Sequence, residues 1–342
     1  MASRQHLYLG TALLTLLASG LSGSQLPSAS ADELSERLAA LPAKIVYETY
    51  RDGNWELFLV HADGSHPVNL THTPDRHELY PHASPDGKKI CFVSDEGQGA
   101  SKVRNVYVMN LDGTGRTLVA ANARQPCWKA DGTAIAYLKG ESDEFTYTDY
   151  ATKGIFLYDL ATGRTEEHPN KDLHHLYNPC WSPDGKWFLA TVHAGMGLRH
   201  GILAIEADGP GVYNLGIPGC RPDVSPDGKH VAWGPSDWAL RIGDLDFSGS
   251  RRRVIGARDV VTSEKPMKIY HVDWSPCGKY VTYSRGPETK RMGRIPEIVG
   301  VRAEGWDIYV ADASATNRFL RITTDGNCNK EPDWVPPGKE SP

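Results

Sequence analysis

One stretch of this 342-residue sequence reads Pro179-Cys180-Trp181-Ser182-Pro183-Asp184-Gly185-Lys186. The Ser-Pro-Asp-Gly part has the composition of a tight turn. Proline fixes φ, aspartate bonds back to its own backbone, and glycine accepts a positive φ. The stretch therefore predicts a sharp reversal of the chain.

The same pattern recurs along the chain, which makes it a structural repeat. The other copies lie at 81–88, 126–132, 222–229, 273–279 and 332–339. Successive motif glycines are 45, 53, 43, 50 and 60 residues apart. This period is typical of a four-stranded blade of a β-propeller, so the six copies predict six blades.

A second repeated feature lies between the turns, and its phase predicts how the ring closes. It is a short apolar strand, usually followed by an Asp-Gly type hairpin, as at 57–64 and 106–113. The first strand, Ile45-Val46-Tyr47, has no turn before it, whereas the last turn, near Trp334, has no strand after it. We therefore expect an all-β, six-bladed propeller closed by pairing of its N- and C-terminal segments.

The ends and the charge of the chain predict its compartment and its class of partner. Residues 7–21 are apolar, and Ala29-Ser30-Ala31 resembles a cleavage site, so residues 1–31 are predicted to be a signal peptide. The remainder divides into a short lead-in, 32–42, and the propeller, 43–342. We expect a periplasmic or secreted protein whose mature chain does not span a membrane. The net charge of -5 argues against nucleic acid as a partner.

The repeats resemble those of the TolB-like propeller family, whose blades carry serial Trp-Ser-Pro-Asp-Gly-Lys motifs. The resemblance covers residues 43–338 and implies the fold. TolB itself has a further N-terminal domain, for which residues 32–42 are too short. Similar blades precede the catalytic domain of prolyl-oligopeptidase-like peptidases, but no Gly-x-Ser-x-Gly motif occurs here, and no hydrolase domain is expected.

Ligands of propellers usually bind at one end of the central channel, so the segments around each Pro-x-Trp element are the candidate sites. Four candidates occupy the position before the tryptophan or its equivalent, and four more histidines or carboxylates lie just ahead of the motif. The full set of tentative ligand-binding residues at the channel mouth is Glu78, His82, His174, His175, Asp223, His271, Asp273 and Asp333. The recurring Trp128, Trp181, Trp274 and Trp334 are interpreted as packing between blades, with a sugar platform as the alternative.

These features leave several functions open. The first hypothesis is a non-catalytic binding or scaffold propeller, without a cofactor, that recognises a protein or glycan of the envelope. The alternative is a metal-dependent, carbohydrate-active enzyme resembling oligogalacturonate lyase, which implies a divalent metal held by channel histidines and a glutamine. The residues for that metal would be His82, His174, His175, His271 and Gln125. The insertion at about 286–305 is predicted to be a specificity loop.

Overall fold

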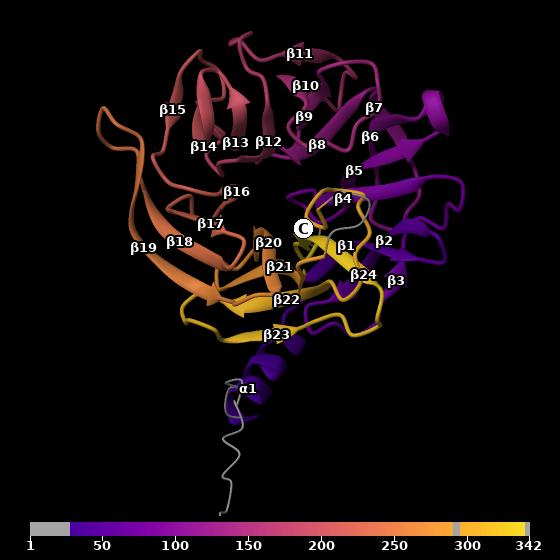
Figure 1. The fold of residues 1–342 in the computed structure, drawn as a ribbon, viewed down its shortest axis with the longest axis vertical. Coiled ribbons are helices and arrows are strands. Elements are labelled where there is room, and N and C mark those ends of the chain that lie inside the picture. Colours follow the sequence, from indigo (N-terminus) through magenta and orange to yellow (C-terminus); the bar gives the residue numbers. More distant parts are fainter. Residues whose placement is uncertain (1–27, 290–294, 339–342) are drawn as a thin grey trace, which may run out of the picture.

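Six four-stranded antiparallel sheets surround a central axis in the computed structural model, which describes residues 28–289 and 295–338 (Figure 1). Blade one contains β24 (Cys328–Val335), β1 (Lys44–Arg51), β2 (Asn54–His61) and β3 (Val68–Asn69). Blade two contains β4 (His77–Ala83), β5 (Lys89–Glu96), β6 (Val103–Asn110) and β7 (Thr117–Ala120), with the 3-10 helix η1 (Gly99–Ser101) after β5. Blade three contains β8 (Ala123–Trp128), β9 (Ala134–Gly140), β10 (Thr152–Asp159) and β11 (Thr165–Glu167).

The remaining three blades follow the same order from the axis outward. Blade four contains β12 (Leu176–Trp181), β13 (Trp187–Gly195), β14 (Leu198–Glu206) and β15 (Val212–Asn214). Blade five contains β16 (Cys220–Val224), β17 (His230–Ser236), β18 (Ala239–Asp246) and β19 (Arg253–Thr262). Blade six contains β20 (Met267–Trp274), β21 (Tyr280–Pro287), β22 (Asp307–Asp312) and β23 (Phe319–Arg321).

The two ends of the described chain meet in blade one. Strand β24, the last in the sequence, is the inner strand of this blade and pairs antiparallel with β1, Ile45 opposite Trp334. Figure 1 shows β24 beside β1 and β2, next to the axis. Because β24 supplies the inner strand that the N-terminal part lacks, the prediction of an all-β, six-bladed propeller closed by its terminal segments is confirmed.

The Ser-Pro-Asp-Gly turns follow the predicted chemistry. In blade four, the Ser182 hydroxyl donates to the Asp184 carboxylate at 2.6 Å and accepts the backbone N–H of Trp187 at 3.0 Å. Gly185 has a φ of 72°, which glycine adopts without a steric penalty. The equivalent serine–aspartate bond recurs in blades two and five. These turns join each inner strand to the second strand of its blade.

The repeated tryptophans pack between blades. Trp128, Trp181, Trp274 and Trp334 are between 3% and 9% exposed, and each belongs to a different apolar cluster. Burying an indole of the inner strand in four of the six blades contributes a large share of the apolar contact that holds neighbouring sheets together. The packing interpretation of these side chains is therefore supported.

A helix that the sequence patterns did not predict precedes the first strand. Helix α1 (Ser28–Ala39) lies outside the ring near β22 and β23 (Figure 1). Leu34 and Leu38, one turn apart, are fully buried against the cluster of blades one and six, and Glu33 pairs with Arg318 at 2.6 Å. Most of the predicted signal peptide lies outside the described residues. No helix in the described part of the chain combines the length and apolar character needed to cross a membrane.

Replacing the indole of the closing strand tests how much the ring depends on blade one. We expect Trp334→Ala to lower the free energy of unfolding by about 3–5 kcal/mol, because a buried aromatic side chain is lost at the closure. Trp238→Ala is the matched control, since this indole is only partly buried beside Lys265. Chemical denaturation of both variants measures the difference. Equal losses would contradict the role assigned to β24.

Candidate functional site

A cavity of about 370 Å³ lies on the axis of the ring, and all six inner strands contribute to its wall. Its outer rim is apolar and comes from one position of the repeated turn. The rim residues are Pro85, Ala130, Pro183, Pro226, Pro276 and Pro336. The four repeated tryptophans also reach the wall below them. The cavity therefore opens at the end of the channel where each inner strand runs into its turn.

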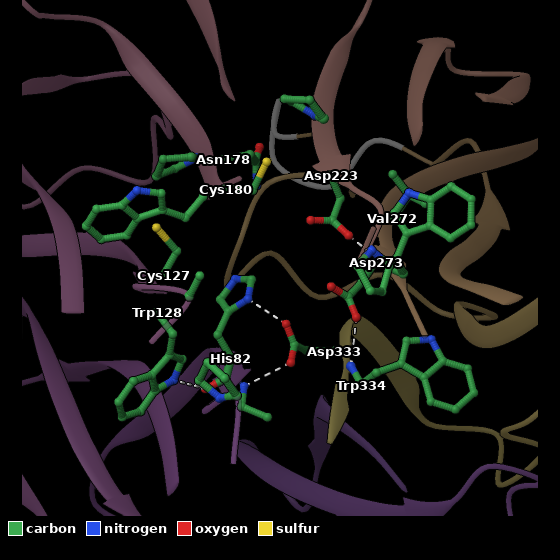
Figure 2. Close-up of a pocket in the computed structure, with 18 of the residues that line it drawn as sticks. His82, Cys127, Trp128, Asn178, Cys180, Asp223, Val272, Asp273, Asp333 and Trp334 are labelled. Carbon is green, nitrogen blue, oxygen red and sulfur yellow. Dashed lines mark hydrogen bonds and ion pairs between the residues drawn. The ribbon is translucent and has the colours of Figure 1, made fainter. Parts of the chain in front are cut away.

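A ring of polar and sulfur side chains lies deeper than the rim, and we call it the middle ring. Its members occupy one repeat position, two residues before the serine of the turn or its equivalent. They are His82, Cys127, Cys180, Asp223, Asp273 and Asp333. Three successive blades, five, six and one, thus supply the three carboxylates, and Figure 2 shows them grouped on one side of the cavity. The two thiols lie on the other side.

Each carboxylate of the middle ring binds the backbone of the next blade. Asp223 accepts the N–H of Trp274 at 2.8 Å, and Asp273 accepts the N–H of Trp334 at 2.8 Å. Asp333 accepts the N–H of the residue after His82 at 2.9 Å, and its second oxygen lies 2.6 Å from His82 Nδ1 (Figure 2). One oxygen of every carboxylate therefore helps to join two blades.

The same carboxylates are unfavourably placed for carrying charge. Burial, together with the neighbouring charge of Asp333, raises the pKa of Asp223 to about 7. Burial also raises the pKa of Asp273 well above its usual range, together with the charges of Asp333 and Asp223. Crowding three carboxylates in a desolvated ring makes full ionisation costly. Asp223 and Asp273 thus retain protons at pH values at which exposed aspartates have lost them.

A second ring closes the cavity below the middle ring, and we call it the floor ring. Its members precede the proline of each repeat or the equivalent Val272, and all six have a left-handed backbone with φ between 47° and 57°. They are Tyr80, Gln125, Asn178, Arg221, His271 and Glu331. The pairing with the second strand shifts register at each of these points, as expected for a β-bulge.

Side chains of the floor ring bind one another across the axis. Asn178 donates its amide N–H₂ to the Tyr80 hydroxyl at 2.7 Å, and its backbone N–H donates to Gln125 at 2.9 Å. On the other side, Arg221 donates to Glu331 at 3.0 Å, and His271 Nδ1 lies 2.7 Å from the same carboxylate. Burial alone would raise the pKa of Glu331, but the charges of Arg221 and His271 outweigh burial and lower it.

Two long loops pack against the floor ring from the other end of the channel. Arg221 also donates to the backbone carbonyl of Glu297 at 2.7 Å and pairs with Asp149 at 3.5 Å. Lys330, which precedes the floor ring on β24, donates to the carbonyls of Pro296 and Ile298 at 3.1 and 3.0 Å. The described part of the predicted specificity loop therefore packs below the floor ring. Residues 290–294 of that loop lie outside the described residues.

The structure brings five of the eight candidate residues together in the cavity: His82, Asp223, His271, Asp273 and Asp333. The other three lie elsewhere.

Glu78 is fully buried and pairs with Arg116 at 2.8 Å. His174 lines a separate surface hollow with Lys153, and His175 lies 3.1 Å from Glu141. The reason is the direction of the inner strands. Glu78, His174 and His175 come before the floor-ring residue of their repeat, whereas the cavity opens at the other end of the strand, where it runs into the turn.

The histidines that the sequence suggested as metal ligands also lie partly in the cavity and partly outside it. His82 and His271 face the cavity, and their rings lie 6.2 Å apart, whereas His174 and His175 do not line it. Gln125 lies in the floor ring and accepts the N–H of Asn178. Across residues 28–289 and 295–338, no three His, Cys, Asp or Glu side chains are arranged to hold a metal ion. All six cysteines are unpaired, and Cys277 is exposed.

Four of the six floor-ring residues were absent from the predicted sites, which included His271 at the channel mouth and Gln125 as a metal ligand, although the sequence marks the position of all six. Each directly precedes the proline of the motif or its equivalent, but the residue type differs in every blade. A search for repeated residue types cannot find a ring whose members all differ. A search for variable residues at a fixed repeat position would have found it.

The raised pKa of Asp223 predicts how stability depends on pH. Its pKa is about 7 in the folded chain and about 3.8 in the unfolded chain, so the folded state binds the proton more tightly. The carboxylate therefore destabilises the fold progressively as pH rises from about 4 to about 7, in a setting shared with Asp273, Asp333 and His82. Asp223→Asn keeps an oxygen for the Trp274 N–H and removes the charge.

We expect Asp223→Asn to raise the melting temperature at pH 8.5 by roughly 2 °C or more and to change it less at pH 5.5. The exposed Asp208 gives the control Asp208→Asn, for which no such pH-dependent gain is expected. Thermal unfolding followed by circular dichroism at both pH values measures the effect. A gain that is the same at both pH values would show that ionisation of Asp223 is not responsible.

Comparisons with known proteins support the fold. No family model matches the chain. The chain is 34% identical over 118 residues to the Tol-Pal system protein TolB of Alcanivorax borkumensis, covering 32% of this chain and 26% of that protein. It is 32% identical over 123 residues to dipeptidyl-peptidase 5 of Porphyromonas gingivalis, covering 32% of this chain and 17% of that protein. The matched region thus spans about a quarter or less of these curated relatives.

A solved structure extends the likeness over most of the chain. The crystal structure of TolB from Acinetobacter baumannii matches with a TM-score of 0.63 and 20% sequence identity, covering 86% of this chain and 67% of that one. The identity is low, so this match concerns the fold alone. Together with the six blades and their closure, these findings show that the chain has a TolB-like β-propeller fold.

Proposed function

We propose that this protein is a non-catalytic binding propeller of the cell envelope, which holds a short protruding segment of a partner protein in its axial cavity. The observation that carries the proposal is the shape of the cavity. Its apolar rim is exposed, while its floor is formed by four side chains of the floor ring, which hydrogen bonds and an ion pair join to the rest of that ring. Such a cup offers a ligand one direction of entry and a fixed set of contacts.

The size of the cup limits what enters it. A volume of about 370 Å³ accommodates a few side chains or the end of a peptide. A folded domain would have to remain outside and rest on the surrounding turns. The proline and tryptophan rim suits the apolar and backbone parts of such a segment, because it is rigid and loses little conformational entropy on binding.

The chemical state of the cavity supports binding rather than catalysis. Burial raises the pKa of the Cys127 and Cys180 thiols well above the usual range, so both remain protonated and weakly nucleophilic. His271 and Arg221 are both engaged with Glu331. These groups act as fixed elements of the floor ring.

The comparisons and the N-terminal sequence support the proposed location and kind of partner. The curated relative from Alcanivorax borkumensis is described as a protein of the Tol-Pal system, which favours the envelope and a protein ligand. The predicted signal peptide over residues 1–31 favours the same compartment. A glycan ligand is the alternative within the same binding role.

Blocking the rim tests the proposal. A displayed library of random peptides would be selected on the wild-type protein, and individual binders would be measured on two variants. We expect Ala130→Trp to weaken these peptides by at least about tenfold, since the new indole would fill the mouth. Ala161→Trp places the same side chain on an exposed outer turn and should leave binding unchanged.

The outcomes separate the alternatives. Binders that are insensitive to Ala130→Trp would contradict the proposed cup, because they would contact another surface. A glycan array on the same three proteins provides the second arm. Binding of a glycan that is lost only in Ala130→Trp, with no peptide showing this behaviour, would replace the protein ligand by a sugar.

A further inference from the structure

One side of the cavity carries two carboxyl groups that have no basic side chain paired with them in the described part of the chain. The carboxylates of Asp223 and Asp273 lie next to each other in the middle ring, close enough for a hydrogen bond between the two carboxyl groups. Each uses one oxygen for the backbone N–H of the next blade. In the described part of the chain, no lysine, arginine or histidine forms an ion pair with either of them. This differs from Asp333, which has His82 as a neighbour.

An amide in the floor ring adds an independent observation of the same kind. Asn178 lines the cavity and is only 4% exposed. Its N–H₂ group donates to Tyr80, but its amide oxygen has no hydrogen-bond partner. A buried carbonyl oxygen without a donor costs free energy, unless a ligand supplies one. The cavity thus has an amide oxygen without a partner in its floor ring, below a pair of carboxyl groups to which no basic side chain in the described part of the chain is paired.

The positive charges near the cavity do not satisfy these acceptors. Arg221 is directed to Glu331, Asp149 and the backbone of Glu297. His271 lies against Glu331 as well. Arg221 is therefore engaged by other carboxylates, and in the described part of the chain neither Arg221 nor His271 forms an ion pair with Asp223 or Asp273.

From this arrangement we infer that the group entering the cavity is a basic side chain of the partner, a lysine or arginine, whose nitrogen lies among Asp223, Asp273 and the Asn178 amide oxygen. The inference rests on the proposed function and names the chemistry that the cup selects. Lysine and arginine carry a cationic donor group at the end of an apolar stem. The charged end would meet the acceptors, while the stem would lie along the proline and tryptophan rim.

Burial strengthens the case for a cation over a neutral donor. A carboxylate pair that is costly to ionise alone becomes easier to ionise when a positive charge lies between its members. Binding of a cation would thus favour the charged forms of Asp223 and Asp273, whose pKa values are raised without it. A neutral donor would meet the same oxygens without stabilising their charge.

Small probes of matched shape test the inference directly. Nα-acetyl-lysine amide and Nα-acetyl-arginine amide carry the cation, and Nα-acetyl-norleucine amide has the same backbone and an apolar side chain. Calcium chloride represents a simple metal cation. Isothermal titration and thermal shift would be recorded for the wild-type protein, Asp223→Asn, Asp273→Asn and the control Asp208→Asn, which removes an equal charge from an exposed turn.

We expect a basic probe to bind the wild-type protein and Asp208→Asn, and the norleucine probe not to bind. The affinity of the basic probe should fall at least about tenfold in Asp223→Asn and in Asp273→Asn. Equal binding of the norleucine probe, unchanged affinity in Asp223→Asn and Asp273→Asn, or no binding of a basic probe up to about 10 mM would each overturn the inference. Binding of calcium alone would also overturn it and assign the carboxylates to a metal ion.

The failure of this inference and the failure of the proposed function can be told apart. Selected peptides that are excluded by Ala130→Trp but tolerate Asp223→Asn would keep the cup as a binding site and reject the basic side chain. Peptides that tolerate both substitutions would reject the cup itself.

Discussion

Convergence of six inner strands on one axis is the constraint on which the rest of the molecule depends. When β24 pairs with β1, the ring closes, and each position of the repeat becomes one level of the channel. The prolines of the turns then form the rim, the residues two before the serine position form the middle ring, and the bulged residues form the floor ring. Without closure, these side chains would not face one another.

This geometry separates positions that hold the fold from positions that give the site its character. The serine, aspartate and glycine of the turn recur because the same backbone bond is made in several blades. The floor position carries a different residue in every blade, and there the side chains bind each other rather than their own sheet. A repeat position that varies is thus the place where one ring departs from six-fold symmetry.

The middle ring both holds the fold together and shapes the site, and it does so at some cost in stability. Asp223, Asp273 and Asp333 each connect two blades through a backbone N–H, yet together they crowd negative charge into a desolvated space. Natural proteins often retain such unfavourable local arrangements where they serve binding. The left-handed backbone of the floor ring is a second local strain in the same place, and it directs side chains to the axis.

Sequence reasoning predicted the fold because turn chemistry and repeat length are local properties. Pro183, Asp184 and Gly185 predict a turn wherever they occur, and the unpaired strand around Ile45 predicts closure. It also identified the middle-ring position of His82 and its equivalents.

Sequence reasoning could not decide which end of the channel is open, since that depends on how the long loops fold back. Glu78, His174 and His175 were for this reason assigned to a mouth that lies at the other end of the inner strands. Helix α1 was missed because its packing face is short: among residues 32–39, whose burial the structure describes, Leu34 and Leu38 alone are fully buried.

A crystal structure determined with Nα-acetyl-lysine amide tests the central claim most directly, because it locates the ligand group relative to the rings. We expect electron density that passes the proline rim and ends within hydrogen-bonding distance of Asp223, Asp273 and the Asn178 amide oxygen. An occupied site on the outer faces of the blades, with the axial cavity filled only by water, would contradict it.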